Sequence, residues 1–415
     1  MMRRFLPAAL LGLLLFLLAA TLSPACRAHA EAIGLLIDVW SLGRETGPGG
    51  GPPPATIAYE GPGGEGRQAD VYCDPRARPR ARLLLAHGLV EAGKDDARLR
   101  TLGRVFARHR FLVVVPDFPG MRALRVGRED IDEVGAALAA AHRLSGCPPS
   151  AGANAGGARR GASGGGAPDP AAAEARLPTG VVGFSYSAGP VILALGRPGA
   201  ARQEDFAVLF GGYADLENVV RFLTTGRHRD RGEDYGGEAL PEGRWIVLQA
   251  NAGSLADPAD RESLAAIGRL RRADPGADIS SLSASLGPSG KSVLDLFANT
   301  DPARFDDLLR RVDPAVRATL DALSPSKSLA RPLPVDLYLL HGRSDAIVPY
   351  TESLKLQRSV RTPGRVHLAI LGGFRHARPQ SEAGAAGWVA ALRHPADSVR
   401  ILEVLAGILE RRADP

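Results

Sequence analysis

The pentapeptide Gly183–Ser187 places one serine between a buried apolar run and a run compatible with a helix. A strand that turns directly into a helix holds its middle residue in a strained backbone conformation. The residues two positions away on each side must then be small, so that strand and helix can pack closely. Gly183 and Ser187 meet this need, although glycine is the commoner residue at the second position. We therefore interpret Ser185 as a nucleophile exposed at the rim of a sheet.

On both sides of this turn, continuous apolar runs alternate with segments of helical periodicity. Residues 82–88 and 111–115 are apolar without alternation, and segments 99–106 and 131–144 carry apolar residues at helical spacing. Runs that are apolar on both faces belong in a parallel sheet covered by helices on each side. The chain therefore predicts an α/β fold with a doubly wound, mostly parallel sheet. Further strands are expected at 55–59, 68–72, 179–182, 206–210, 335–340 and 366–371, and a closing helix at 398–410.

The alternation of strands and helices ends after residue 213. The segments that follow have helical periodicity, often with proline near the first turn. We expect a helical lid over residues 214–330, inserted between a first core part, 55–213, and a second core part, 331–415. Residues 148–173 consist mainly of glycine, alanine and proline, which predicts a disordered insertion within the first core part.

Residues 1–30 are expected to be a signal peptide or an N-terminal membrane anchor. Two arginines precede the apolar segment Phe5–Leu22, and Ala28-His29-Ala30 offers the small residues that a signal peptidase reads. The apolar segment is also at the lower limit of length for spanning a bilayer. We expect export to the periplasm or beyond, with anchoring to the inner membrane as the alternative. Residues 31–54 are expected to be a Gly/Pro-rich linker.

The formal net charge of +6 comes almost entirely from arginines that are scattered among acidic residues. Without aromatic interleaving or a basic helix face, this pattern disfavours nucleic-acid binding. The segment Arg227–Arg231 is expected to be a solvated loop. Cys26, Cys73 and Cys147 show neither metal-ligand spacing nor a disulfide framework. In an exported chain Cys73 and Cys147 could pair, but nothing in the sequence places them together; a lipid-modified Cys26 is a further alternative.

A serine hydroxyl needs a general base to take its proton, and that base needs a third group to orient it. Such groups are expected after strands that end at the same edge of the sheet as Ser185. Asp345 follows the expected strand 335–340, and His376 follows the last expected strand. The catalytic candidates are therefore Ser185, Asp345 and His376.

The order of these motifs resembles that of the α/β-hydrolase superfamily. The motifs are Leu85-Ala86-His87-Gly88, Pro116–Gly120, the Ser185 turn, the stretch His341–Pro349 and the glycine pair before His376. The resemblance covers nearly the whole chain except the leader, the insertion and the details of the lid.

This resemblance implies an α/β-hydrolase fold and an oxyanion hole formed by the backbone N–H groups of Leu89 and Tyr186. It also leaves Asp215, after the preceding strand, as an alternative acid. The implied activity is hydrolysis of an ester or related acyl bond through a covalent acyl-enzyme. No metal or organic cofactor is expected, and the partner is a small-molecule acyl substrate.

The same machinery serves peptidases, thioesterases and acyltransferases, which the sequence does not separate from carboxylic-ester hydrolases. A non-catalytic envelope binding protein with this fold is the alternative from another class. Membrane association is expected only through the N-terminal segment.

Overall fold

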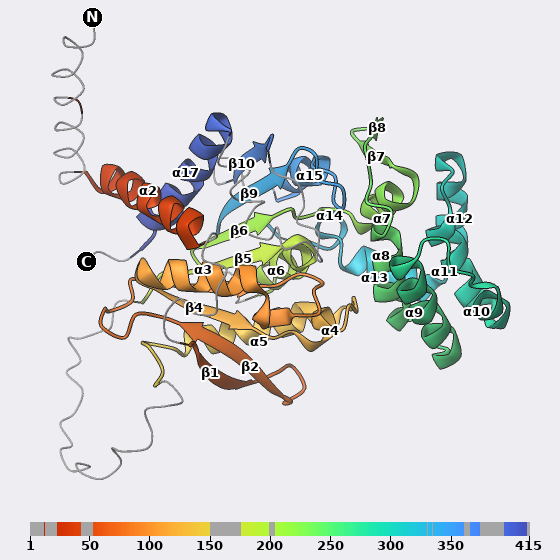
Figure 1. Cartoon of the computed structure of the whole chain (residues 1–415), viewed down its shortest axis with the longest axis horizontal. Coiled ribbons are helices and arrows are strands. Elements are labelled where there is room, and N and C mark those ends of the chain that lie inside the picture. The colour runs from red at the N-terminus through yellow and green to blue at the C-terminus, as the bar shows by residue number, and fades with distance from the viewer. Residues whose placement is uncertain are drawn as a thin grey trace, which may run out of the picture.

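The structure of the protein is a computed structural model. It describes residues 12, 23–42, 53–149, 176–198, 204–329, 331–333, 335–360, 366–373 and 394–412. Figure 1 shows a sheet with helices on both of its faces and a helical region at one end. The expected insertion at 148–173 lies almost entirely outside the described residues, and so does the apolar segment Phe5–Leu22 apart from Gly12.

The main sheet has eight strands in the order β1-β2-β4-β3-β5-β6-β9-β10. Only β2 runs against the others, since it pairs antiparallel with both β1 and β4 while every other pairing is parallel. The strands are β1 (Ala55–Glu60), β2 (Gly66–Tyr72), β3 (Ala81–Ala86), β4 (Phe111–Pro116), β5 (Thr179–Phe184), β6 (Phe206–Phe210), β9 (Asp336–Gly342) and β10 (Val366–Leu371). The predicted doubly wound, mostly parallel sheet is confirmed.

The central strands are apolar on both faces because each face is covered by helices. In β3, Leu84 packs into one hydrophobic cluster, whereas Leu83 and Leu85 pack into a second cluster on the opposite face. The first face carries α5 (Glu129–His142), α6 (Ala188–Leu195) and α15 (Thr351–Ser359). The second face carries α2 (Pro24–Leu42), α3 (Ala97–Arg108) and α17 (Pro395–Glu410).

Helix α2 corrects the predicted linker at 31–54, because residues 31–42 are helical. Ala28, Ala32 and Leu35 lie at helical spacing and are buried against the second face of the sheet. With α3, α17 and the second face of the sheet, this helix lines an apolar pocket of about 70 Å³. Among the described helices, none combines the length and the apolar character needed to cross a bilayer.

The region between β6 and β9, for which a helical lid was predicted, is mostly helical. Its helices are α7 (Leu216–Thr225), α8 (Gly243–Asn251), α9 (Pro258–Ala273), α10 (Ser280–Ser285), α11 (Pro288–Ala298), α12 (Phe305–Arg311), α13 (Pro314–Ala322) and α14 (Pro325–Ser328). Asp-Pro pairs begin several of these turns: Asp257 and Asp313 each accept a hydrogen bond from the amide two residues further on. Aspartate at the N-cap and proline at the first helical position explain where these helices start.

The lid also contains a two-stranded hairpin that was not predicted. It consists of β7 (Arg227–Asp230) and β8 (Glu233–Gly236), paired antiparallel. The segment Arg227–Arg231, expected to be a solvated loop, therefore forms mostly a strand. His228 and Asp230 on this strand are buried, since they bind Thr351 and Arg358 of α15.

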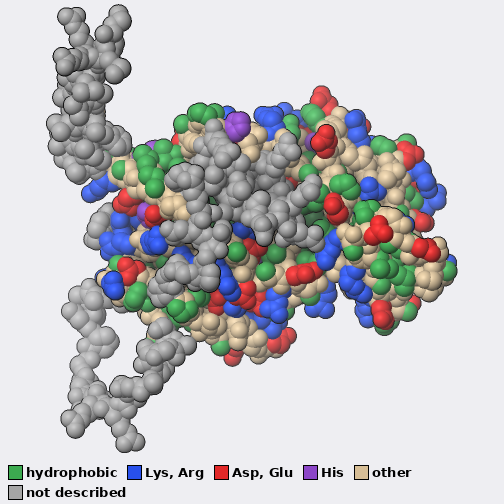
Figure 2. Space-filling model, viewed as in Figure 1, with side chains coloured by type: hydrophobic (Ala, Val, Ile, Leu, Met, Phe, Trp, Pro, Cys, Tyr) green, Lys and Arg blue, Asp and Glu red, His purple; other side chains and the backbone are tan. Residues whose placement is uncertain are grey.

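The lid and the sheet share one hydrophobic cluster. Trp245, Phe297 and Phe305 of the lid belong to the same cluster as Tyr186 and Tyr213, which lie next to β5 and β6. Two backbone hydrogen bonds join the lid to core loops, Val126 N–H to the Ala250 carbonyl (3.0 Å) and Leu240 N–H to the Ala346 carbonyl (2.7 Å). The lid is thus packed as part of the domain. On the face in Figure 2, arginine and lysine side chains are interspersed with acidic ones.

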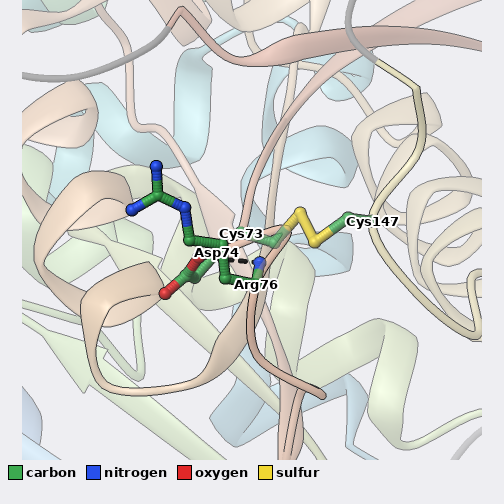
Figure 3. Close-up of a disulfide and its surroundings, with 4 residues drawn as sticks. All are labelled: Cys73, Asp74, Arg76 and Cys147. Carbon is green, nitrogen blue, oxygen red and sulfur yellow. Dashed lines mark hydrogen bonds between the residues drawn. A yellow bond between two sulfur atoms is a disulfide. The ribbon is translucent and has the colours of Figure 1, made fainter.

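A disulfide joins Cys73, just after β2, to Cys147, in the loop after α5 (Figure 3). Beside it the amide of Arg76 donates to the Asp74 carboxylate and closes the turn after β2. Structural disulfides persist in oxidising compartments, so this bond agrees with the expected export, which stays a prediction. The sequence left the pairing open, and the structure brings the two cysteines together.

We expect the double variant Cys73→Ser/Cys147→Ser to be less stable than the wild type by up to about 4 kcal/mol. The reason is that the bond closes a loop with a sequence separation of 74 residues, whose entropy the reduced unfolded chain regains. Urea unfolding under oxidising conditions measures the difference. Cys26→Ser is the control, because Cys26 is a free cysteine. Equal unfolding midpoints for the double variant and the wild type would contradict a structural role for the bond.

Candidate active site

Ser185 occupies a strained turn between β5 and α6. Its φ is +54°, a left-handed backbone conformation that is rare for a residue with a side chain. A Cβ atom at Gly183 would lie 2.9 Å from the Cα of Ala188, so strand and helix approach closely enough to require glycine there. The predicted steric reason for a small residue at position 183 is confirmed.

Ser187 fastens this turn to the neighbouring strand. The residue is fully buried, and its hydroxyl donates to the carbonyl of Ala86 at the end of β3, at 2.7 Å. The same oxygen accepts the amide of Phe184 at 2.9 Å. Serine in place of the commoner glycine therefore joins the turn to β3 by a hydrogen bond.

The loop after β3 lies directly against the same turn. A Cβ atom at Gly88 would lie 2.8 Å from the carbonyl oxygen of Phe184 and 3.4 Å from the Cβ of Ser185. The next backbone amide, that of Leu89, has no hydrogen-bond acceptor among the described residues. Gly88 thus allows the backbone of this loop to approach the serine.

His87 holds that loop in place and is not positioned as a base. Its Nε2 accepts the amide of Phe118 at 3.0 Å, so the ring proton is on Nδ1, which donates to the carbonyl of Gly88 at 2.8 Å. Burial lowers the pKa of His87, which keeps the ring neutral. Both ring nitrogens are therefore engaged with the backbone.

Ser185 and Gly88 follow neighbouring parallel strands, whose next helices cover opposite faces of the sheet. Helix α3 after β3 covers the second face, and α6 after β5 covers the first. A change of covering face between neighbouring parallel strands marks a topological switch point, and open α/β sheets bind their ligands at the carboxyl ends of the strands at such a point. A strained serine in the turn between a central parallel strand and the next helix, in a sheet of this strand order, is typical of one fold. The chain has the α/β-hydrolase fold.

No family model matches the chain, and no curated protein matches it in sequence. Solved structures to which it is similar include the rice cell wall degrading esterase LipA from Xanthomonas oryzae, with 14% identity, 83% of this chain and 87% of that chain covered, and a TM-score of 0.46. Another is the esterase domain of a Rhodothermus marinus protein. The identity is 14%, the match covers 86% of this chain and 98% of that chain, and the TM-score is 0.38. A third is the acylaminoacyl peptidase of Pyrococcus horikoshii. The identity is 14%, the match covers 80% of this chain and 39% of that chain, and the TM-score is 0.40. Because these scores are below 0.5, the fold assignment depends on the strand order and the Ser185 turn.

In this α/β-hydrolase fold, Asp345 lies in the loop after β9 with its side chain buried. Its Oδ1 accepts the amides of Ile347 at 2.8 Å and Val348 at 2.9 Å, which fix the orientation of the carboxyl group. The Nε2 of His341 is 3.6 Å from Oδ2, but this nitrogen donates to the carbonyl of Val348. The Nδ1 of His341 accepts the hydroxyl of Ser353, so His341 orders the loop.

Asp215, the alternative acid, serves a different purpose. Its carboxylate caps α7 by accepting the amide of Glu217 at 3.0 Å. Its own amide donates to Glu352, a fully buried carboxyl group that also accepts the amide of Ala214. Burial raises the pKa of Glu352. These contacts explain Asp215 as a helix cap and favour Asp345 as the acid.

His376 lies outside the described residues, so its role stays a prediction. The start of the loop that leads to it is held by Asp397 of α17, whose Oδ2 accepts the amide of Gly373 at 2.8 Å. Another imidazole, that of His394, lies against Gly373. His394 was not singled out from the sequence, and it is the rival imidazole at this end of the sheet. Within the described part of the chain, no cluster of three or more His, Cys, Asp or Glu side chains could hold a metal ion.

A buried carboxyl group behind the Ser185 turn was also missed from the sequence. Asp130, in the first turn of α5, is only 2% exposed. Its Oδ2 accepts the hydroxyl of Tyr186 at 2.6 Å and the amide of Gly127 at 3.0 Å. Burial raises the pKa of Asp130 to about 6, although both hydrogen bonds act in the opposite direction.

We expect Asp130 to make the protein less stable as the pH rises. Because the pKa is about 6 in the folded chain and near 4 when unfolded, the stabilising contribution is complete below pH 4 and is lost between about pH 4 and 6. One pKa unit corresponds to about 1.4 kcal/mol, so the loss is at most about 3 kcal/mol. Urea unfolding across pH 4 to 7.5 measures this loss as a pH-dependent difference in the free energy of unfolding between the wild type and Asp130→Asn.

Asp132→Asn is the matched control, since Asp132 is an exposed carboxylate on the same helix. Its stability is expected to follow that of the wild type with pH. If the free energies of unfolding of the wild type and Asp130→Asn differ by the same amount over this pH range, the carboxyl group does not titrate as described.

Proposed function

We propose that this protein is a serine hydrolase that cleaves an ester or related acyl bond through a covalent acyl-enzyme. The observation that carries the proposal is the φ of +54° at Ser185, in a strand-to-helix turn with Gly88 packed against it. Backbone strain of this kind is retained where it exposes a reactive group. The turn places one hydroxyl at the carboxyl ends of the parallel strands, where open α/β sheets bind their ligands.

In the proposed reaction, Ser185 Oγ attacks the acyl carbon while His376 takes the hydroxyl proton. The same imidazole then gives the proton to the leaving group, and Asp345 orients the ring. The tetrahedral oxyanion accepts hydrogen bonds from the amides of Leu89 and Tyr186. Water attacks the acyl-enzyme in the second half of the cycle and regenerates the serine.

The spacing of the strands supports Asp345 in this role. β9 is two strands from β5 in the sheet, and neighbouring strands lie about 4.8 Å apart, so the two loops are separated by roughly 10 Å. That is a distance one imidazole can bridge with a hydrogen bond at each end. The base is expected after β10, the next strand along.

Several classes of acyl substrate are compatible with this reaction. Carboxylic esters are the first choice, and peptides, thioesters and transfer to another acceptor use the same attack. The lid is expected to select the acyl group. A panel of p-nitrophenyl esters of increasing chain length, one thioester and one peptide anilide ranks these classes by kcat/KM.

We expect a fluorophosphonate to label the wild type at one serine and to leave Ser185→Ala unlabelled. The reagent forms a covalent bond only with an activated nucleophile, which this substitution removes. Intact mass spectrometry measures the adduct, and hydrolysis of p-nitrophenyl acetate should fall by about 10³-fold or more in the variant. Equal labelling of both proteins would remove Ser185 from the mechanism, and no labelling of either would favour a non-catalytic binding protein.

We expect His376→Ala and Asp345→Asn each to lower kcat for p-nitrophenyl acetate by about 10³-fold or more. The first removes the base, and the second removes the charge that orients it. The matched controls His394→Gln and Asp215→Asn should stay within about threefold of the wild type, since asparagine still caps α7. Circular dichroism confirms that each variant is folded. An active Asp345→Asn with an inactive Asp215→Asn would transfer the role of the acid, and the same outcome at His376 and His394 would transfer that of the base.

A further inference from the structure

The side chain of Tyr186 is fixed at two points. Its hydroxyl donates to Asp130 at 2.6 Å, and its ring stacks on Tyr213 with the centroids 6.3 Å apart and the planes 19° apart. The residue is 6% exposed, and burial raises the pKa of its hydroxyl well above the ordinary value, which keeps it a donor. A tyrosine ring has only two rotatable side-chain bonds. Fixing its hydroxyl and one face therefore restricts the backbone at residue 186.

The backbone amide of Tyr186 is one of the two groups proposed to bind the oxyanion. Tyr186 directly follows Ser185, and its amide nitrogen lies 3.7 Å from the position that a Cβ of Gly88 would occupy. The two amides assigned to the oxyanion thus belong to the turn and to the loop that touches it. Donors to an oxyanion are effective only when their direction is set before the charge develops.

Asp130 is itself held between three parts of the structure. It lies at the start of α5 and accepts the amide of Gly127 in the preceding loop. The neighbouring residue in that loop, Val126, donates its amide to the carbonyl of Ala250 at the end of α8 in the lid. One carboxyl group therefore connects the nucleophile turn to the loop on which the lid is seated.

A purely structural contact at this position would not need a carboxyl group. Burying a carboxyl group is costly, and an apolar pair of the same volume packs as well or better. The start of α5 offsets part of that cost, because a helix N-terminus favours negative charge. What the pair adds over an apolar contact is direction, since a hydrogen bond fixes the ring where packing alone would let it turn.

We propose that Asp130 is a positioning residue for acyl transfer, which orients the oxyanion-binding amide of Tyr186 by accepting the hydroxyl of that residue. The inference rests on the proposed function of Ser185. Asp130 touches neither the substrate nor the reacting atoms, and acts only through Tyr186.

The test uses Tyr186→Phe and Asp130→Leu in the full chain, with p-nitrophenyl acetate as substrate and trifluoroacetophenone as inhibitor. The ketone forms a tetrahedral adduct with a nucleophilic serine and so reports on the oxyanion amides. We expect kcat/KM to fall by about 10- to 100-fold through kcat, with KM within about twofold. The inhibition constant of the ketone should rise by the same factor as kcat/KM falls.

Tyr213→Phe is the matched control, because Tyr213 is equally buried and its hydroxyl has no hydrogen-bond partner among the described residues. Its kinetics should stay at the wild-type level. If the wild type is active and Tyr186→Phe has the same kcat and the same ketone affinity, the proposed role of Asp130 is wrong while the proposed function stands. The same conclusion follows if Tyr213→Phe loses as much kcat and ketone affinity as Tyr186→Phe. Should Asp130→Leu fail to fold, Tyr186→Phe decides. A wild type that neither hydrolyses the ester nor reacts with the fluorophosphonate would overturn the proposed function, and this inference with it.

Discussion

The positive φ of Ser185 is the constraint on which the rest of the site depends. The strained conformation persists because its surroundings leave no room for another: Gly183 lets the helix approach the strand, Gly88 lets the next loop approach the turn, and Ser187 ties the turn to β3. Strain of about 1–3 kcal/mol at one residue is small beside the burial of the central strands. The sheet therefore supports a backbone conformation that the turn alone would not keep.

Three buried carboxyl groups show how neighbours assign different roles to the same chemical group. Asp345 is oriented by two amides of its own loop at the end of β9. Glu352, in the first turn of α15, accepts the amides of Ala214 and Asp215 at the beginning of the lid. Asp130 accepts a phenol hydroxyl behind the nucleophile turn. Their hydrogen-bond donors and their places in the fold, and not burial alone, distinguish these three carboxyl groups.

The sheet was predictable because its signal is local. Each central strand is a short apolar run, and the structure places every expected strand within two residues of its predicted ends. Helix α15 escaped prediction because its buried face is polar, with Thr351, Glu352 and Ser353 turned inward, so hydrophobic periodicity does not show it. The hairpin β7–β8 escaped because its buried His228 finds its partner about 120 residues away along the chain, in Thr351. The roles of Asp130 and Ser187 were hidden for the same reason, since their partners come from other elements.

Helix α2 sets an order of events for any maturation of the N-terminus. The small residues that a signal peptidase would read, Ala28-His29-Ala30, lie inside this helix, and Ala28 is buried against the sheet domain. A peptide bond within a packed helix is poorly accessible to a protease. Removal of a leader at that site would have to come before α2 docks, and the shortened chain would still contribute Ala32 and Leu35 to the apolar layer that covers the sheet.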